Sequence, residues 1–152
     1  MQQRLDYKNA APGALPAMLQ LEAYVEQSGL ERSLLELVKI RASQINGCAF
    51  CLRMHTRDAR KAGQTEERIY LLDAWREAPF YSDRERAALE WTETLTLVSE
   101  GGVPDEVYQR VSRQFSQREL VDLTLAVVAI NGWNRICIGF AVQHMPATMA
   151  AA

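Results

Sequence analysis

Apolar residues recur along most of the chain at the three- and four-residue spacing of an α-helix. In the segment 33–46 such a face consists of Leu34, Leu37, Val38 and Ile45. No segment shows sustained alternation of apolar and polar residues between hairpin turns, which is the pattern of a half-buried β-strand. The pattern therefore predicts an all-α fold.

Turn and capping signals divide this pattern into separate helices. Ser82 with Glu85, and Ser116 with Glu119, match the Ser-x-x-Glu capping box, so helices should begin near residues 83 and 117. The other expected helices are Pro16 to Gln27, Ser33 to Asn46, a cysteine-bearing helix that ends at Gly63, Thr65 to about Glu77, and a short one from Pro104 after a Gly-Gly break.

One segment, LVDLTLAVVAING at 120–132, is apolar nearly all round, so we expect it to be buried on every side. It would then lie at the centre of the domain or in an oligomer interface. Its last residues begin AINGWNRI at 129–136, which is similar to QINGCAFC at 44–51. We interpret the pair as a duplicated helical hairpin in which one copy keeps the cysteines, although shared helix-ending residues explain the likeness equally well.

The composition suits one folded domain over residues 1–152, with its core at about 16–145. A chain of 152 residues with 48% apolar residues can bury a core without a disulfide framework. The net charge of −2 comes from 17 basic and 19 acidic residues that are mixed along the sequence. No basic patch is visible, so we do not expect nucleic acid as a partner.

Neither a signal peptide nor a membrane span is expected. The N-terminal MQQRLDYKNAAPG lacks an apolar core, and no uninterrupted apolar run approaches the roughly 20 residues that cross a bilayer. We therefore expect a cytoplasmic protein. In such a reducing compartment a close cysteine pair is typical of a catalytic or metal-binding site rather than of a structural disulfide.

The stretch QINGCAFCLRMHTRDARKAG, residues 44–63, concentrates the candidate chemistry. If a helix starts beside Gly47, Cys48 lies in its first turn, and Cys51 and His55 follow on the same face. The positive end of the helix dipole favours thiolate over thiol, and a neighbouring imidazole can take the thiol proton. The three side chains therefore form a candidate redox site.

Glu36 is expected to lie on the preceding helix, at a distance from the turn similar to that of His55. It lies roughly 15 Å before Asn46, and His55 lies roughly 10 Å into the next helix, at 1.5 Å per residue. If Gly47 makes the two helices antiparallel, the carboxylate faces the imidazole and can orient it as a base. The alternative is that Glu36 only closes a capping box with Ser33.

Other cysteine and histidine residues have plainer interpretations. The Cys48–Cys51 pair also fits half of a zinc site, but zinc usually takes four ligands, a second cysteine pair is absent, and His144 is distant in sequence. We therefore predict no metal. Cys137 is expected to be a small buried apolar residue.

Several further residues are expected to be structural. Trp75, Trp91 and Trp133 should anchor the core or an interface, and Asn131, Asn134 and Arg135 should cap or cross-brace helices.

The spacing of Glu36, eleven residues, Cys48-x-x-Cys51, three residues and His55 resembles the signature of the alkylhydroperoxidase D-like (AhpD-like) group of the carboxymuconolactone decarboxylase superfamily. LVKIRASQINGCAFCLRMHTRDARKAG, AWREAPFYSDRERAALEWTETLT, VPDEVY and AINGWNR are similar to its small bacterial members, over most of residues 4–140. The resemblance implies an all-helical fold, a homo-oligomer built from trimers and often a hexamer, and peroxidase chemistry regenerated by a dithiol.

The same resemblance assigns roles. Cys51 would be the peroxidatic thiol, deprotonated with help from His55, Cys48 the resolving thiol, and Glu36 the end of the proton relay. The best-known AhpD proteins carry a further relay histidine just before the second cysteine, where this chain has Phe50. The helix-dipole argument alone favours Cys48 as the low-pKa nucleophile, and the two arguments disagree on this point.

No nicotinamide or flavin fingerprint is visible, because the Gly-x-Gly-x-x-Gly turn is absent. No cofactor is therefore expected, and electrons would come from a dithiol reductant, lipoyl or thioredoxin-like, to reduce a hydroperoxide substrate. Two other functions remain open: a non-enzymatic redox sensor or disulfide-exchange oligomer, and a lactone-decarboxylating enzyme of the same superfamily.

Overall fold

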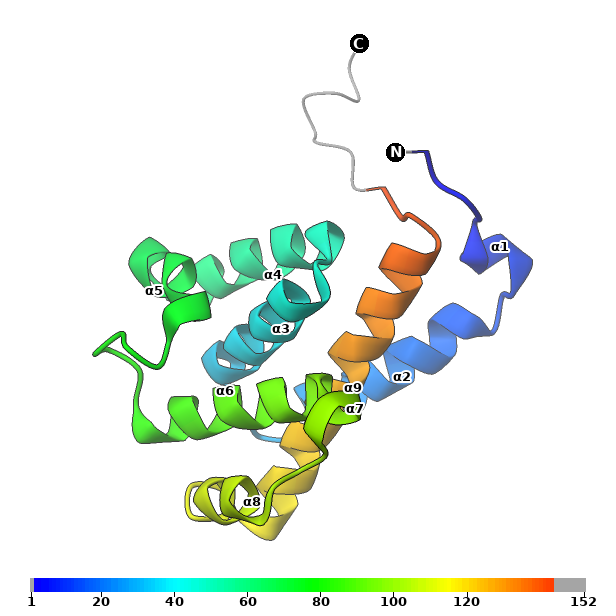
Figure 1. Cartoon of the computed structure of the whole chain (residues 1–152). Helices are drawn as coiled ribbons and strands as arrows, with labels where there is room; N and C mark the ends of the chain where they lie inside the picture. The colour runs from blue at the N-terminus through cyan, green and yellow to red at the C-terminus, as the bar shows by residue number, and fades with distance from the viewer. Residues whose placement is uncertain (1, 144–152) are drawn as a thin grey trace.

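Within residues 2–143, the part of the chain that the computed structural model describes, every regular element is a helix (Figure 1). The elements are α1 (Tyr7–Ala10), α2 (Ala14–Glu26), α3 (Arg32–Asn46), α4 (Ala49–Lys61), α5 (Glu66–Tyr70), the 3₁₀ helix η1 (Leu72–Ala74), α6 (Asp83–Thr96), α7 (Val98–Gly101), α8 (Asp105–Ser112) and α9 (Gln117–Gly139). The all-α prediction is confirmed. His144 and the C-terminal tail lie outside the described residues.

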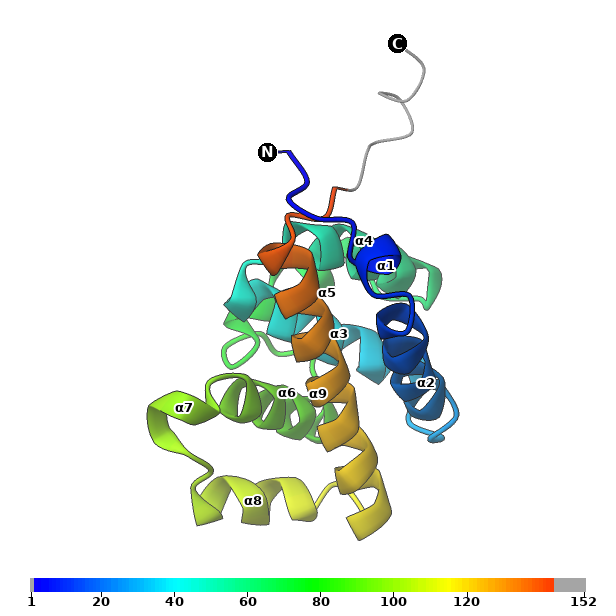
Figure 2. The same ribbon diagram turned by 90° about the vertical axis from the view of Figure 1, so that its right-hand side faces the viewer.

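The longest helix, α9, lies at the centre of the arrangement and packs against α2, α3 and α6 (Figure 2). Leu123, Ala126 and Ile130 on its inner face are almost fully buried. Val121 and Val128, however, are 57% and 51% exposed. Within one chain, residues 120–132 are therefore not buried on every side, because no described element covers the outer face of α9, and burial of that face in an oligomer interface stays a prediction.

By length and mean hydropathy, α9 is also the one helix within residues 2–143 that could cross a membrane. Half of this segment is buried inside the protein, against the three helices that surround it. The carboxyl group of Asp122 is buried there as well and accepts a hydrogen bond of 2.8 Å from the Tyr24 hydroxyl. Packing in the core thus accounts for the apolar residues on the inner face of α9.

A tight turn at Gly47 makes α3 and α4 antiparallel neighbours (Figure 1). Gly47 has φ +68° and ψ +33°, the left-handed conformation that glycine adopts without steric cost at the end of a helix. The Cys48 amide then donates to the Ser43 carbonyl oxygen at 3.0 Å, which ends α3. Cys48 itself is extended and serves as the N-cap of α4, so it lies just before the first turn and not within it as expected.

Two of the predicted helix starts carry the predicted capping boxes. Ser82 and Glu85 satisfy each other's backbone N–H groups at the start of α6, and Ser116 and Glu119 do so at the start of α9. The helices at α2, α3 and α8 also lie close to their expected ranges.

The helix expected from Thr65 to Glu77 is shorter and broken. α5 ends at Tyr70, and after η1 the chain forms turns. The Arg86 guanidinium holds the turns that follow η1, since it donates to the carbonyl oxygens of Trp75 and Arg76, at 2.9 and 3.1 Å, and to that of Ala78. These carbonyls are therefore held by a side chain from α6 instead of continuing a helical ladder.

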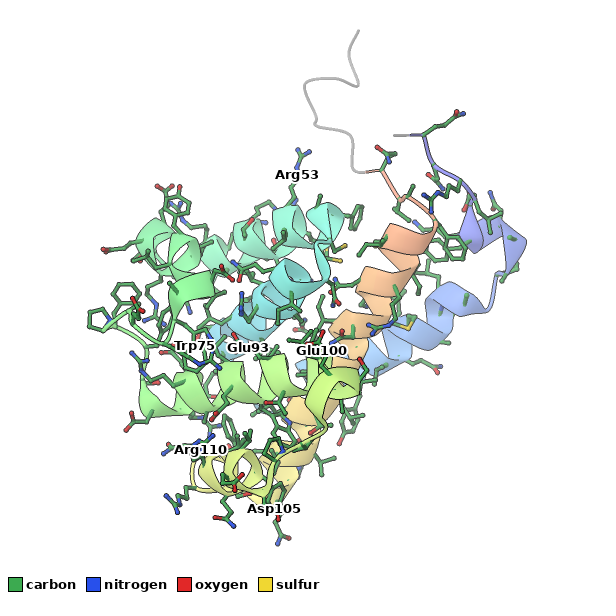
Figure 3. The ribbon with its side chains drawn as sticks, in the orientation of Figure 1. Arg53, Trp75, Glu93, Glu100, Asp105 and Arg110 are labelled. Carbon is green, nitrogen blue, oxygen red and sulfur yellow. The ribbon has the colours of Figure 1, made fainter. Side chains whose placement is uncertain are left out.

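A second link fixes the same segment to the bundle. The Trp75 indole N–H donates to Glu93 at 2.8 Å, and Arg41 on α3 donates to the same carboxylate at 2.7 Å; Figure 3 labels Trp75 and Glu93 between η1 and α6. Trp75 and Trp91 are buried, as expected of core anchors.

The duplicated-hairpin interpretation was wrong. Gly132, the counterpart of Gly47, lies inside α9 and does not end a helix. A Cβ atom at this position would lie 3.0 Å from Cε of Met18, so the glycine lets α2 approach α9 closely.

Asparagines cross-brace the helices as predicted. The Asn46 side-chain amide donates to the oxygens of Asn131 and Asn134, both at 2.9 Å. Asn134 donates in turn to the Ser43 hydroxyl at 3.0 Å, and Asn131 to Thr96 at 3.0 Å. These bonds fix the C-terminal half of α9 against the end of α3, next to the cysteine pair.

Candidate active site

Glu36 and His55 face each other between α3 and α4. His55 Nδ1 lies 2.9 Å from Glu36 Oε2, and both residues are buried, with exposed fractions of 6% and 4%. The predicted meeting of the two side chains is confirmed, whereas the capping interpretation of Glu36 is not, because α3 begins at Arg32, before Ser33. When Nδ1–H donates to the carboxylate, Nε2 remains as an acceptor for a proton.

A buried cation lies one helical turn beyond Glu36. Lys39 is 2% exposed, pairs with Glu22, and approaches Glu26 at 3.3 Å. Burial alone would lower the pKa of Lys39, but Glu22, Glu36 and Glu26 raise it overall, so the ammonium stays charged. Lys39 therefore offsets the negative charge of the Glu36 carboxylate beneath His55.

Three cysteines converge beside this pair. The Sγ atoms of Cys48, Cys51 and Cys137 all lie within 4.8 Å of one another, and all three residues are buried. Cys137 is buried as expected, but its place in this cluster was missed. The one signal in the sequence was the odd number of cysteines, since no local spacing reveals that the end of α9 meets the start of α4.

The cluster distributes its protons unequally. The thiols of Cys137 and Cys51 donate hydrogen bonds to Cys48 and, with the backbone N–H groups of Cys51 and Phe50, lower the pKa of Cys48 despite its burial. The same two neighbours, Cys137 and Cys48, together with burial, raise the pKa of Cys51. The first proton lost from the cluster therefore leaves Cys48, in agreement with the helix-dipole argument.

A cavity of about 280 Å³, which we call the Cys51 cavity, opens onto Cys51 and His55. Its walls are mainly apolar and are formed by Tyr7, Leu19, Phe50, Met54 and Trp133. Glu22, the partner of Lys39, and Cys137 also border it. Trp133 was expected to be a core or interface anchor, and its place in this wall was not anticipated.

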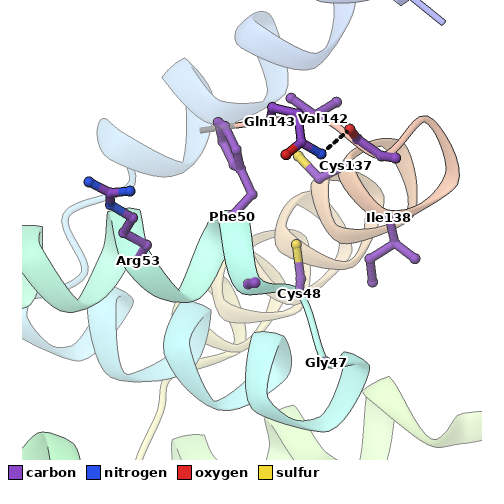
Figure 4. Close-up of a pocket in the computed structure, with 10 residues that line it drawn as sticks. Gly47, Cys48, Phe50, Arg53, Cys137, Ile138, Val142 and Gln143 are labelled. Carbon is purple, nitrogen blue, oxygen red and sulfur yellow. Dashed lines mark hydrogen bonds between the residues drawn. The ribbon is translucent and has the colours of Figure 1, made fainter. Parts of the chain in front are cut away.

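A second cavity of about 450 Å³, the Cys48 cavity, lies on the other side of the cysteines and is bordered by Cys48 and Cys137 (Figure 4). Arg53 and Gln143 add polar groups to its wall. Figure 3 shows Arg53 projecting from α4 away from the body of the protein. The predicted single face that carries Cys48, Cys51 and His55 is therefore divided, because Cys48 opens to one cavity and the other two residues to the other.

The cysteine cluster offers three ligand atoms to a metal ion. No fourth histidine, aspartate or glutamate joins the cluster within residues 2–143, and a structural zinc site takes four ligands. The donor set by itself is thus better suited to thiol chemistry than to a structural zinc ion.

Comparisons with known proteins agree with these features. Residues 11–94 match the model of the carboxymuconolactone decarboxylase family. The uncharacterized protein YdfG of Bacillus subtilis (strain 168) is 51% identical over 138 residues, which are 91% of this chain and 94% of YdfG.

Solved structures share the arrangement of helices. A crystal structure from Agrobacterium tumefaciens, of a protein of unknown function described as a candidate antioxidant defence protein AhpD, has a TM-score of 0.92 and 45% identity, over 95% of this chain and 99% of that one. The debrominase Bmp8 has a TM-score of 0.81 at 17% identity, over 93% of this chain and 76% of that one, which is a likeness of fold alone.

Proposed function

Because the chain belongs to the carboxymuconolactone decarboxylase family, we propose that it is an AhpD-like thiol peroxidase, which reduces organic hydroperoxides with electrons from a dithiol. One observation carries this proposal. Cys51 and His55 open into the same apolar cavity, and His55 is held by Glu36 in the orientation that leaves Nε2 as a base.

The first step takes place in the Cys51 cavity. His55 accepts the proton of Cys51, and the thiolate attacks the terminal oxygen of the hydroperoxide. The O–O bond breaks, the alcohol leaves with the proton that His55 had accepted, and Cys51 becomes a sulfenic acid. Glu36 stabilises the imidazolium that forms in this step, as the aspartate of a Ser-His-Asp triad stabilises its histidine.

His55 acts without the additional histidine of the best-known AhpD proteins. Phe50 stands at that position and borders the Cys51 cavity. The chain therefore has one base where those proteins have two, and an apolar wall suited to the hydrocarbon part of a hydroperoxide.

Cys48 performs the second step. Its lowered pKa makes it the resting thiolate of the cluster, so it is ready to attack the Cys51 sulfur. An S–S bond forms, the S–O bond breaks, and the hydroxide leaves as water with a proton from the solvent. In the proposed cycle the resting negative charge is therefore on Cys48, whereas the peroxide reacts with Cys51.

The reductant approaches through the Cys48 cavity. A slim dithiol, such as a lipoyl arm or a thioredoxin-like protein, attacks the disulfide, passes on both electrons and leaves as a disulfide. Glutathione needs two successive encounters for the same result. A dithiol-regenerated cycle suits a reducing cytoplasm.

Peroxide consumption under defined reductants tests the proposal. We expect turnover of cumene hydroperoxide with dihydrolipoamide, much slower turnover with glutathione at equal thiol concentration, and none with NADPH alone. Cys51→Ser should lose turnover. Equal rates for Cys51→Ser and the unchanged protein would contradict the mechanism.

One further outcome distinguishes the main alternative. If peroxide converts the cysteines to a disulfide but no dithiol restores them catalytically, the protein is a redox sensor and not a peroxidase.

A further inference from the structure

Cys137 is the one cysteine that the proposed cycle does not use. It comes from the last turns of α9, and its Sγ lies within 4.8 Å of the sulfur atoms of both Cys48 and Cys51. Figure 4 shows the side chains of Cys48 and Cys137 facing the space between the start of α4 and the end of α9. A third thiol is thus held within 4.8 Å of both sulfur atoms of the reacting pair.

The position of Cys137 differs from that of the other two cysteines. Among the described lining residues, Cys137 and Phe50 are the two that border both cavities. Cys48 borders the Cys48 cavity, and Cys51 borders the Cys51 cavity. Cys137 can therefore meet an oxidised sulfur atom on either side of the cluster.

Cys137 is protonated in the resting protein. Its hydrogen bond to the Cys48 thiolate, together with burial, raises the pKa of Cys137 to about 11, against a smaller opposing effect of Cys51. At neutral pH it is a thiol and does not compete with Cys51 for the peroxide. When Cys137 acts as a nucleophile, its proton leaves with the hydroxyl of the Cys51 sulfenic acid, so Cys48 remains a thiolate.

We propose that Cys137 is a third redox-active residue, a second resolving thiol that condenses with the sulfenic acid of Cys51 to form a disulfide between α9 and α4. This proposal rests on the peroxide reduction proposed above.

The step balances without another reagent. The Cys137 S–H proton and the hydroxyl of the Cys51 sulfenic acid leave together as water, and the Cys51–Cys137 bond replaces the S–O bond. The Cys48 thiolate can then attack Cys51 in this disulfide, which forms the Cys48–Cys51 disulfide and releases Cys137. The disulfide can therefore move within the cluster, while one thiol always remains.

A second resolving thiol would also protect Cys51 against over-oxidation. Sulfenic acid that waits for a resolving thiol is exposed to a second peroxide and to irreversible over-oxidation. Two resolving thiols shorten this wait, so loss of one should be tolerated and loss of both should not.

Disulfide mapping tests the assignment. Unchanged protein, Cys48→Ser, Cys137→Ser and the double variant are reduced, treated with a chelator and given one equivalent of cumene hydroperoxide. Dimedone traps sulfenic acid and an alkylating agent traps free thiols. Cleavage after Arg41, Arg53 and Arg135 separates Cys137 from the other two cysteines, and in Cys48→Ser a single cysteine remains in the peptide 42–53.

We expect Cys48→Ser to yield a peptide cross-linked between Cys51 and Cys137, with little dimedone on Cys51. The double variant should lose this cross-link and carry dimedone or over-oxidised Cys51 instead. Equal dimedone labelling in Cys48→Ser and the double variant, with no Cys51–Cys137 peptide, would overturn the proposal.

The unchanged protein separates the two proposals. If it consumes peroxide and forms a disulfide while Cys48→Ser fails to cross-link, the second resolving role fails and the peroxidase proposal stands. If the unchanged protein forms no oxidised cysteine at all, both fail. Cys137→Ala serves as a second variant, compared by thermal unfolding, in case serine disturbs the packing of α9.

Discussion

His55 Nδ1 lies 2.9 Å from Glu36 Oε2, a hydrogen bond between two buried side chains on successive antiparallel helices. The bond fixes the imidazole with its other nitrogen available, and Lys39 balances the carboxylate charge from the next turn of α3. The peroxidase proposal makes this bond the source of base strength at Cys51.

Loss of the base should therefore slow the first chemical step. We expect His55→Ala to reduce the rate near neutral pH by about 100-fold, the lower end of general-base contributions. Because the pKa of Cys51 is raised, the remaining activity should increase with pH as the thiol ionises without help. Initial rates with cumene hydroperoxide across the neutral to alkaline range measure both effects.

Glu36→Gln should show a smaller loss of the same kind, since the amide keeps a hydrogen bond to His55 but not the charge. Glu90→Gln, which alters an ion pair with Arg110 on the α6–α8 side of the protein, is a matched control. An unchanged pH profile in His55→Ala would remove His55 from the proton relay.

The charge of the cluster can be measured directly. We expect ultraviolet thiolate absorbance to show one group that ionises below the usual cysteine range, Cys48, and two that ionise above it. In Cys137→Ala the largest hydrogen bond to Cys48 is lost and its pKa should rise.

Alkylation at a pH below the lowered pKa of Cys48 should then slow by about tenfold, since a hydrogen bond to a charged group contributes ~1.5–3 kcal/mol and 1.4 kcal/mol is a factor of ten. Cys137→Ser keeps a hydroxyl donor and should be affected less. Identical alkylation rates in the alanine variant and the unchanged protein would show that Cys137 does not stabilise the thiolate.

The apolar wall of the Cys51 cavity should select the hydroperoxide. Leu19 borders this cavity and is 51% exposed, so a polar residue is tolerated there structurally. We expect Leu19→Asp to raise KM for cumene hydroperoxide by about tenfold, because one apolar contact contributes on the order of 1.5 kcal/mol, and to leave KM for hydrogen peroxide nearly unchanged.

Leu97→Asp, at a similarly exposed leucine that does not line the cavity, controls for the added charge. Equal effects of Leu19→Asp on both peroxides would argue against hydrocarbon recognition in this cavity.

The turn at Gly47 should be sensitive to a single methyl group. Since φ is +68° there, Gly47→Ala should destabilise the protein by about 1–2 kcal/mol, the cost of the left-handed conformation in a residue with a Cβ. Gly139→Ala adds the same atom at the end of α9, where nothing lies within 4 Å, and should not destabilise. Urea unfolding compares the two, and equal stability losses would contradict the explanation.

The outer face of α9 predicts self-association. Val121, Val128 and Ile138 are 57%, 51% and 45% exposed on this one helix, and we expect them to meet a second copy of the chain in a trimer-based assembly, with a hexamer as the expected form. Light scattering should give a mass well above the 17.2 kDa of one chain. Val128→Asp should lower it, whereas Val103→Asp, on the loop before α8, should not.

A stable monomer of the unchanged protein at micromolar concentration would contradict this expectation. In that case the exposed valines would be ordinary surface residues.

Features specified by neighbouring residues could be predicted from the sequence. The capping boxes at Ser82 and Ser116 and the Glu36–His55 contact depend on helix geometry over a few turns and one tight connection. Features specified by distant residues could not. Arg86 on α6 holds the carbonyl oxygen of Trp75 in the turn after η1, and no pattern near Trp75 indicates this contact.

The same distinction applies to the site. The Cys-x-x-Cys spacing identifies Cys48 and Cys51 in the sequence. Cys137 and Trp133 join them only through the docking of α9, which depends on the whole core. Gly47 and Gly132 stand in similar sequences, yet Gly47 ends α3 whereas Gly132 lies inside α9, next to Met18.

Because α9 follows α4 by many residues in the sequence, the cluster that the two helices form is completed late in biosynthesis. Glu36, Cys48, Cys51 and His55 leave the ribosome early, whereas α9 follows all other described elements. Until α9 docks, the cysteine pair lacks Trp133 and Cys137 and is open to oxidants in the growing polypeptide. Synthesis and docking of α9 therefore complete the enclosure of the reactive sulfur atoms, and nascent chains arrested before residue 117 should be alkylated at Cys48 and Cys51 far more readily than the folded protein.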